Sequence, residues 1–263
     1  MNKSVLDFYG FSYMPFSKTI PVEKVFATRG FKEALAQLEY GISEEDFLLL
    51  TGTVGIGKSV VINTLLHNID ANLYTPLYIR GSGLSEGELY KSILAGLDRQ
   101  PPCFLQGAKR MFYTVVPELT RKPIVVIDDA QEMQESAMMS LKSMTNFTAD
   151  SQSRLTFLLA GQPELKGRLK LSQFLPLAQR IRLFCHMKPM TLKETIGYID
   201  HHTGIAGNPA PLFSDSAKAD IHRHAEGIPR VVNMVCYRSL INAVIKGVKV
   251  IDSADVFFEK LSD

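Results

Sequence analysis

The sequence predicts an α/β protein in which helices sandwich a parallel β-sheet and a smaller, purely helical region follows. Three observations predict this fold. Short apolar runs alternate with helix-like segments as far as about residue 188, the first run leads into a glycine loop, and no strand-like run follows Pro189. Strands that alternate with helices are typical of a parallel sheet covered on both faces.

Composition fits one soluble α/β core with an appendage. Hydrophobic residues make up 46% and charged residues 21% of the 263-residue chain. The net charge of +2 permits a nucleic-acid partner but does not by itself indicate one. Cys103, Cys185 and Cys236 lie far apart, which favours free thiols in a reducing compartment. Because no apolar run is long enough to span a bilayer, we expect a cytoplasmic protein without a membrane partner.

The elements follow one another in a simple order. An irregular, aromatic-rich arm occupies residues 1–28, and helical spacing begins at Gly30. Strands are expected at 46–51, 73–79, 123–128, 154–160 and 181–187, and helices after Lys58 and near 86–97, 108–120 and 132–146. Pro76 lacks a ladder donor, so the second strand is predicted at an edge of the sheet.

The region after Pro189 is predicted to contain helices alone. Three are expected at 191–205, 214–226 and 229–245, with a fourth at 252–261. Two S/T-x-x-E capping boxes mark helix starts, Ser85 with Glu88 and Thr191 with Glu194. We therefore expect an arm at 1–28, a core at 29–188 and a helical lid at 189–263.

The sequence GTVGIGKS from Gly52 to Ser59 matches the pattern G-x-x-x-x-G-K-[ST] between a predicted strand and a predicted helix. Its glycines let backbone N–H groups surround phosphate oxygens. Lys58 is expected to reach the β- and γ-phosphates of ATP, and the Ser59 hydroxyl to ligate Mg²⁺. The nucleotide-contacting residues are expected to be Gly52, Thr53, Val54, Gly55, Ile56, Gly57, Lys58, Ser59 and Val60.

An acidic pair follows the buried run IVVI. Asp128 is placed to hold the Mg²⁺ hydration shell, and Asp129 to orient or deprotonate an attacking water. An acidic pair after a strand is also common as a loop cap, but the spacing from Lys58 in an α/β frame favours the catalytic interpretation.

Three further polar positions have two interpretations each. Gln162 follows a predicted strand, and either lies between the carboxylates to sense the γ-phosphate or faces solvent in an ordinary turn. Arg230 lies in the first turn of a helix that Pro229 begins, and either contacts the γ-phosphate or is a solvated arginine. Arg180 and Arg182 precede the last strand, where an arginine either enters a neighbouring subunit's site or is solvated.

Seven segments in order resemble the AAA+ ATPases related to the general secretory pathway protein A ATPase, within the P-loop NTPases of the ASCE type. They are FYGFSYMPFSKTIP, LEYGI, GTVGIGKS, IDDAQ, LAGQPEL, AQRI and GIPRVVN, and they span nearly the whole chain. The chain looks most like the short ATPases encoded beside transposases in bacterial transposons. This resemblance implies a nucleotide sandwiched between subunits of a homo-oligomeric ring or filament, with Gln162 as sensor 1, Arg180 as finger and Arg230 as sensor 2.

The resemblance also implies an activity and partners. It points to an ATPase that binds duplex DNA and serves a separate transposase as a helper. Asp129 stands where the family usually has glutamate, which puts the hydrolysis rate in doubt because general-base geometry is tight. Arg80, Lys109 and Arg110 are candidate phosphate contacts, although a solvated surface explains them equally well. The alternatives are a secretion-related envelope assembly ATPase, a small-molecule kinase, and a nucleotide switch with little hydrolysis.

Overall fold

The computed structural model describes residues 2–17, 20–44, 46–147 and 154–258. Contacts divide the chain into two compact units. The sheet unit comprises residues 31–54 and 58–187, and the helical unit comprises residues 1–30, 55–57 and 188–263. The division into arm, core and lid stays a proposal beside this grouping.

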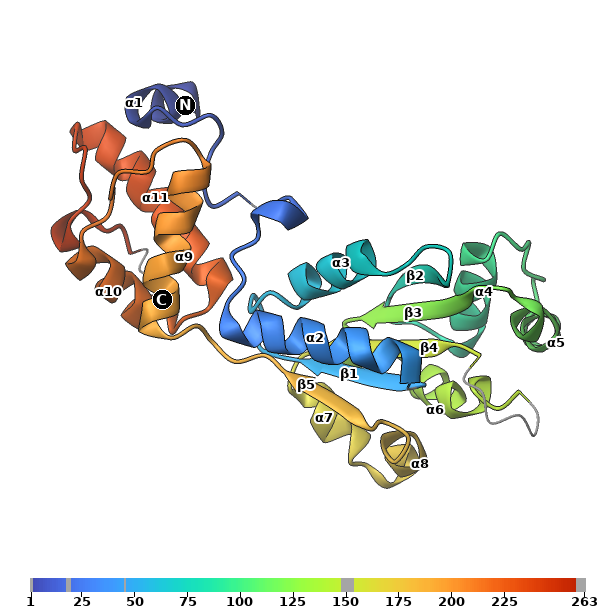
Figure 1. Cartoon of the computed structure of the whole chain (residues 1–263). Helices are drawn as coiled ribbons and strands as arrows, with labels where there is room; N and C mark the ends of the chain where they lie inside the picture. The colour runs from blue at the N-terminus through green and yellow to red at the C-terminus, as the bar shows by residue number, and fades with distance from the viewer. Residues whose placement is uncertain (1, 18–19, 45, 148–153, 259–263) are drawn as a thin grey trace. The chain divides into compact units, whose positions relative to one another are not determined.

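A parallel sheet is the centre of the sheet unit (Figure 1). Its strands are β1 (Phe47–Thr51), β2 (Tyr74–Arg80), β3 (Lys122–Asp128), β4 (Thr156–Gly161) and β5 (Leu183–His186). In the described residues they form one five-stranded sheet in the order β2-β3-β4-β1-β5, and each neighbouring pair is parallel. The predicted fold class is confirmed, and so is the edge position of the strand that contains Pro76.

Seven α-helices within the described residues accompany this sheet. They are α2 (Arg29–Glu44), α3 (Lys58–Asn68), α4 (Glu86–Gly96), α5 (Leu105–Val115), α6 (Glu135–Met144), α7 (Glu164–Leu169) and α8 (Leu175–Ala178). Figure 1 shows α2 and α3 on one side of the sheet and α6 and α7 on the other. The predicted helix near 132–146 begins later, because Asp129 takes a left-handed conformation and a 3-10 turn, Ala130–Glu132, follows it.

Alternation along the strands builds the core. Phe47 and Leu49 of β1 join one large apolar cluster with residues of α4 to α8. Since successive side chains point to opposite faces, Leu48 and Leu50 point to the other face. There α2 approaches so closely that a Cβ on Gly41 would meet Leu48 Cδ2 at 2.5 Å. All five residues of β1 are buried, which fixes the strand that leads into the glycine loop.

The helical unit has its own apolar cluster. The helical unit contains α1 (Asn2–Tyr9), α9 (Leu192–Ile205), α10 (Asp215–Ala225) and α11 (Pro229–Lys246). The expectation of an irregular arm is wrong for α1, which forms because its buried Val5 and Tyr9 join the apolar cluster of the C-terminal helices. The Tyr9 hydroxyl donates to the Val248 carbonyl at 3.0 Å. Further along the arm, the Phe16 ring stacks on His202.

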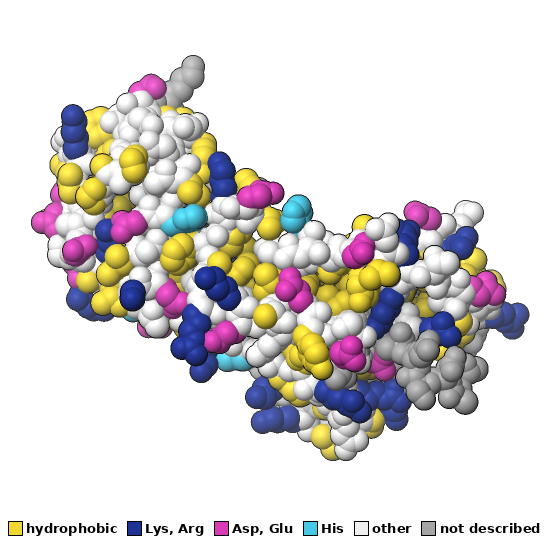
Figure 2. Space-filling view, viewed as in Figure 1, with side chains coloured by type: hydrophobic (Ala, Val, Ile, Leu, Met, Phe, Trp, Pro, Cys, Tyr) yellow, Lys and Arg dark blue, Asp and Glu magenta, His cyan; other side chains and the backbone are white. Residues whose placement is uncertain are grey.

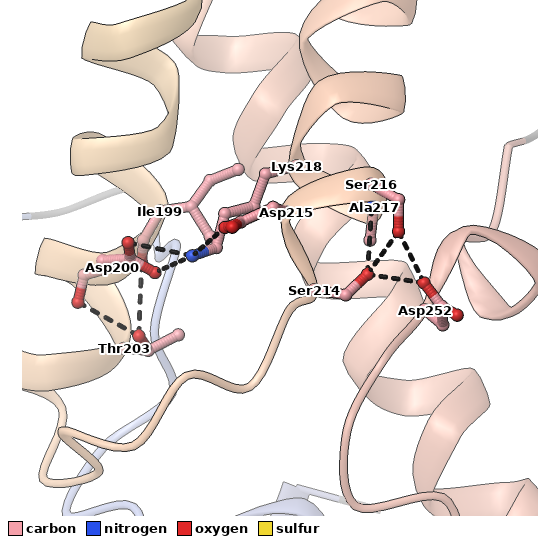
Figure 3. Close-up of polar contacts among 9 residues, drawn as sticks. All are labelled: Ile199, Asp200, Thr203, Ser214, Asp215, Ser216, Ala217, Lys218 and Asp252. Atoms are coloured by element: carbon pink, nitrogen blue, oxygen red, sulfur yellow. Dashed lines mark hydrogen bonds and ion pairs between the residues drawn. The ribbon is translucent and has the colours of Figure 1, made fainter.

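The predicted fourth C-terminal helix is also wrong where the structure describes it. Residues Ser253–Asp255 form a 3-10 turn, and Val256 is extended, whereas the end of the predicted helix lies outside the described residues. The carboxylate of Asp252 explains the turn, because it accepts hydrogen bonds from Ser214, Ser216 and the backbone N–H of Ser253. These hydrogen bonds lower the pKa of Asp252 to about 2. Figure 3 shows this cluster at the start of α10.

A buried lysine joins α9 to α10. The Lys218 side chain is 4% exposed, and its Nζ lies 2.7 Å from Oδ1 and 2.9 Å from Oδ2 of Asp200 (Figure 3). Asp215 lies farther away, at 3.7 Å, and its side chain is 94% exposed. Burying an ammonium group is costly without a charged partner, so Asp200 is the partner that makes this position tolerable.

Both capping boxes are confirmed, with the side-chain and backbone hydrogen bonds present at Ser85 and at Thr191. In the part of the chain that the structure describes, no helix has the length and apolar character needed to cross a membrane.

We predict that Asp200→Asn destabilises the protein more than Asp215→Asn. The first change removes the charge that faces the buried Lys218 ammonium, and charged hydrogen bonds contribute about 1.5–3 kcal/mol each. The second change removes an exposed charge, for which less than about 1 kcal/mol is expected. Chemical denaturation followed by circular dichroism measures both free energies of unfolding, and equal losses would contradict this account.

Candidate functional site

The strand order gathers three chain segments at one edge of the sheet. The glycine loop follows β1, the acidic pair ends β3, and Gln162 follows β4. Because β4 lies between β3 and β1, the carboxyl ends of these parallel strands are neighbours. Binding sites of open α/β sheets form at this edge. The fold therefore brings Lys58, Asp128 and Gln162 to one place within the sheet unit.

The glycine loop has the backbone shape of a phosphate cradle. Gly55 and Gly57 have φ values of 81° and 105°, which side-chain-bearing residues rarely adopt. At its start, the loop is tied to β4 by the N–H of Gly52, which donates to the Gly161 carbonyl at 3.3 Å. The Lys58 ammonium donates to the carbonyls of Gly52 at 2.7 Å and Thr53 at 3.2 Å. A phosphate would offer this lysine stronger, charged acceptors.

The Asp128 carboxylate accepts hydrogen bonds from Ser59, Tyr78 and Asp129. Its Oδ2 accepts from the Ser59 hydroxyl at 3.5 Å and from the Tyr78 hydroxyl at 2.5 Å. Its Oδ1 accepts from the backbone N–H of Asp129 at 3.0 Å. Burial, followed by the hydrogen bond to Asp128, raises the pKa of Tyr78 well above its ordinary value, so the hydroxyl stays a donor. The sequence did not single out Tyr78, because this contact depends on the pairing of β2 with β3.

Asp129 has left-handed backbone geometry, with φ 52° and ψ 41°. Such a conformation is uncommon outside glycine, although aspartate is among the residues that tolerate it best. The backbone of Gly81 lies close to this bend, and the Gly81 N–H donates to the Asp128 carbonyl at 2.6 Å. A Cβ on Gly81 would meet the carbonyl oxygens of Asp129 and Asp128 at 2.7 and 2.9 Å. The chain therefore turns sharply where the acidic pair ends β3.

Gln131 links the acidic pair to the end of β4, and the sequence analysis missed it. Its Nε2 donates to Asp129 Oδ1 at 3.3 Å, and its Oε1 accepts from the backbone N–H of Gln162 at 3.1 Å. Arg168 fixes the same segment by donating to the Gln131 carbonyl at 2.8 Å. Gln162 itself lies between the ends of β1 and β3, half-buried, as sensing a γ-phosphate would require. This sensing role stays a prediction.

The two arginines before β5 have different surroundings. Arg180 donates to the Lys142 carbonyl at 2.9 Å, to Thr145 Oγ1 at 2.7 Å and to Asn146 Oδ1 at 2.8 Å. These acceptors lie at the C-terminal end of α6, where a cation is favoured by the helix dipole. Arg182 is exposed. A finger role for Arg180 would require exchange of these acceptors for phosphate oxygens.

Arg230 is the second residue of α11, and Pro229 occupies the first helical position as predicted. Its backbone N–H donates to the Gly55 carbonyl at 3.2 Å. A Cβ on Gly55 would approach Arg230 Cβ to 2.6 Å, so a larger residue would not fit beside this helix start. The Arg230 side chain is exposed, and a phosphate contact for it stays a prediction.

The predicted DNA contacts differ in how far their charge is compensated. Lys109 is paired with Glu86 at 2.7 Å and lies over the Tyr90 ring. Arg80 is exposed at the end of β2, and Arg110 is exposed on α5. The pairing of Lys109 reduces the positive charge that it can offer to a phosphate.

A stronger basic feature was missed, although the sequence contains its signal. Between Glu164 and Glu194 there is no acidic residue, while seven basic residues occur at 166, 168, 170, 180, 182, 188 and 193. Lys166 and Lys170 lie one turn apart at α7 and are both exposed. Figure 2 shows dark-blue side chains gathered over the surface that α7 and α8 occupy in Figure 1. The net charge of +2 does not reveal this local excess of basic residues.

The residues present fit a Mg²⁺–nucleotide group. The Ser59 hydroxyl and the Asp128 carboxylate lie close enough to address one cation, and both offer the hard oxygen ligands that Mg²⁺ prefers. Positive φ angles at Gly55 and Gly57 shape the loop for phosphate. Lys58 would hold the phosphates, Ser59 would ligate the ion, and Asp128 would hold its water shell.

Comparison with known proteins agrees with this geometry. Residues 41–169, which include the glycine loop, the acidic pair and Gln162, match the sequence model of the family described as AAA domain. The chain is 31% identical over 256 residues to general secretion pathway protein A of Aeromonas hydrophila, a match that covers 95% of this chain and 46% of that protein. The chain thus spans about half the length of this curated relative.

Solved structures share the fold at low identity. The Cdc6p structure from Pyrobaculum aerophilum matches with a TM-score of 0.66 and 18% identity, covering 94% of this chain and 68% of that chain. The Aeropyrum pernix ORC1 protein in complex with DNA matches with a TM-score of 0.69 and 14% identity, covering 89% of this chain and 65% of that chain. These likenesses show a P-loop AAA fold and nothing further about this chain.

We predict that Gln131→Ala slows ATP hydrolysis at least about tenfold, because a general base contributes about 10²–10⁴-fold only when it is positioned, and Gln131 would position Asp129. Nucleotide affinity should change less than threefold, because Gln131 contacts Asp129 and the backbone of Gln162 rather than the glycine loop. Gln131→Glu should hydrolyse ATP no faster than Gln131→Ala, since a second carboxylate would repel the Asp129 carboxylate. Steady-state turnover and binding of a fluorescent ATP analogue measure the two effects, and normal turnover in Gln131→Glu would refute the orienting role.

Proposed function

We propose that this chain, an AAA+ ATPase related to general secretion pathway protein A, is an ATP-controlled, largely sequence-non-specific DNA-binding protein that serves a separate transposase as a helper. The observation that carries the ATPase part is the meeting of Lys58, Ser59 and the acidic pair at one edge of the sheet. The resemblance to transposon-encoded ATPases supports the helper role. The acid-free basic run of residues 165–193 supports an anionic partner.

The residues of the candidate site divide the work of hydrolysis among them. Lys58 exchanges the loop carbonyls for phosphate oxygens, and backbone N–H groups of the glycine loop hold the remaining charge. Mg²⁺, when bound, neutralises phosphate charge and orients the transferring group. Asp129 positions the attacking water, and Gln131 holds this carboxylate in place through Nε2. Gln162, at the end of β4, contacts the γ-phosphate and so senses whether it is present.

Aspartate at position 129 sets the expected rate. Its carboxylate reaches one methylene less far than the glutamate that the resembling family usually carries. The left-handed backbone at this residue and the hydrogen bond from Gln131 fix where that shorter side chain can point. Slow hydrolysis suits a switch that stays assembled while ATP remains bound.

An oligomer is the proposed working form. An arginine supplied by a neighbouring subunit stabilises the charge that develops during phosphoryl transfer. Arg180 is the proposed finger, and Arg182, which is exposed, is the alternative. Arg230 is proposed to link nucleotide state to the helical unit through the start of α11.

Duplex DNA is the proposed anionic partner. Lysines and arginines that contact phosphates position a duplex without reading its sequence. Lys166 and Lys170 offer exposed charges in a segment without carboxylates, whereas Lys109 is already paired with Glu86. Arg80 and Arg110 remain proposed contacts beside them.

One observation favours a second function. The curated relative that matches 95% of this chain is named for general secretion, so a secretion-related envelope assembly role follows from the same sequence likeness. That role would make a protein rather than DNA the ligand of the basic surface. Turnover that responds to a protein partner but not to DNA would favour it.

We predict that duplex DNA stimulates ATP turnover and that the stimulation falls steeply with salt. Phosphate contacts release condensed counterions, so the logarithm of the binding constant should fall linearly with the logarithm of salt concentration. Lys58→Ala should abolish turnover with and without DNA. Steady-state hydrolysis across a salt series measures this, and turnover that ignores DNA at every salt concentration would refute DNA control.

We predict that the double variant Lys166→Glu/Lys170→Glu weakens DNA binding more than Lys109→Glu/Arg110→Glu does. Each lost phosphate contact lowers the salt slope by about 1, so the first variant should lower it by about 2. The second variant frees Glu86 and loses less, because Lys109 is already neutralised. Fluorescence anisotropy with a labelled duplex measures both slopes, and the reverse ranking would place the DNA on α5.

A further inference from the structure

Tyr78 belongs to the edge strand of the sheet but reaches the metal-binding carboxylate of the neighbouring strand. In the β2–β3 register, Tyr78 pairs with Val126 and Arg80 pairs with Asp128. Leu77 and Ile79 of β2 are buried, whereas Tyr78 and Arg80, which alternate with them, point to the opposite face and are exposed. The Tyr78 side chain therefore points toward the Asp128 carboxylate and is long enough to contact it.

Among the described residues, the Tyr78 hydroxyl is the closest donor to the Asp128 carboxylate. It lies 2.5 Å from Oδ2, whereas the Ser59 hydroxyl lies 3.5 Å from the same oxygen. The backbone N–H of Asp129 holds the other oxygen, Oδ1, at 3.0 Å. Donors on both oxygens fix the rotation of the carboxylate about its bond to the β-carbon, because each oxygen has its own directed partner. Without the tyrosine hydroxyl, Oδ2 would keep only the long contact to Ser59 among the hydrogen bonds described for it.

We propose that Tyr78 is a positioning residue whose hydroxyl holds the Asp128 carboxylate in the orientation that binds the Mg²⁺ of the nucleotide. A carboxylate oxygen has two lone-pair directions, so Oδ2 can accept from Tyr78 with one and from the ion's water shell with the other once Ser59 ligates the ion. The supporting partner of a metal-binding carboxylate commonly changes metal affinity by about 10- to 100-fold when it is lost. The inference rests on the nucleotide-binding part of the proposed function.

The tyrosine is well placed for this role because its other side is open. Tyr78 is 48% exposed and lines a groove of about 580 Å³ together with Arg80, Ser82 and Glu88. The ring can therefore adjust by a small rotation when the ion's water shell enters, without disturbing the core.

Tyr78→Phe tests the proposal, because it removes the hydroxyl and keeps the ring. We expect the Mg²⁺ concentration that gives half-maximal binding of a fluorescent ATP analogue to rise about 10-fold, by analogy with other supporting partners of metal ligands. Binding of the same analogue in EDTA should change less than twofold, since Tyr78 contacts the carboxylate and not the glycine loop. In turnover, the Mg²⁺ dependence should shift by the same factor while the rate at saturating Mg²⁺ stays within about twofold.

Tyr74→Phe is the matched control, since Tyr74 begins the same strand four residues earlier and lies on the same face as Tyr78. Its Mg²⁺ dependence should equal that of the unchanged protein. An unchanged or lowered Mg²⁺ requirement in Tyr78→Phe, with the thermal unfolding temperature of the nucleotide-free protein preserved, would overturn the proposal. If the unchanged protein bound no nucleotide at any Mg²⁺ concentration, the proposed function would fail instead, so the two failures are distinguishable.

Discussion

The parallel pairing of β3 with its two neighbours is the constraint on which the candidate site depends. Val125 and Val126 of β3 point to opposite faces, and both are fully buried, so the strand buries apolar surface on both sides of the sheet. Burial of that surface, at about 25 cal/mol per Å², holds the end of β3 in place. Because Asp128 is the last residue of this strand, its contacts to Ser59 and Tyr78 are set by the core and not by the loop.

The core also sustains a strained turn. A non-glycine residue held in a sparsely populated backbone region costs about 1–3 kcal/mol and persists only where its surroundings impose it. At Asp129 the surroundings are the hydrogen bond from the Gly81 N–H to the Asp128 carbonyl and the one from the Glu132 N–H to the Asp129 carbonyl. They force the chain away from the sheet directly after the Asp128 carboxylate. The second carboxylate thereby points toward Gln131 and the end of β4 instead of continuing the strand.

The sequence predicted what depends on local patterns. Apolar runs, the glycine loop and the missing donor of Pro76 act within a few residues, and each led to a feature that the structure confirms. Tyr78 and Gln131 could not be found in this way, because Asp128 of β3 and the backbone of Gln162 after β4 become their neighbours only through the sheet order. The helix α1 was missed because it forms against distant helices, since isolated helices this short are marginal in water.

The charge of one segment differs from the net charge of the whole chain. A net charge of +2 is an average over a chain in which residues 165–193 carry seven basic and no acidic side chains. Screening confines electrostatic attraction to about 8–10 Å at physiological salt, so a partner responds to the run and not to the average. Within that run Arg168 and Arg180 are fixed by backbone carbonyls, whereas Lys166 and Lys170 are exposed. Arg168 thus supports the candidate site through the Gln131 carbonyl, whereas Lys166 and Lys170 stay exposed on the surface.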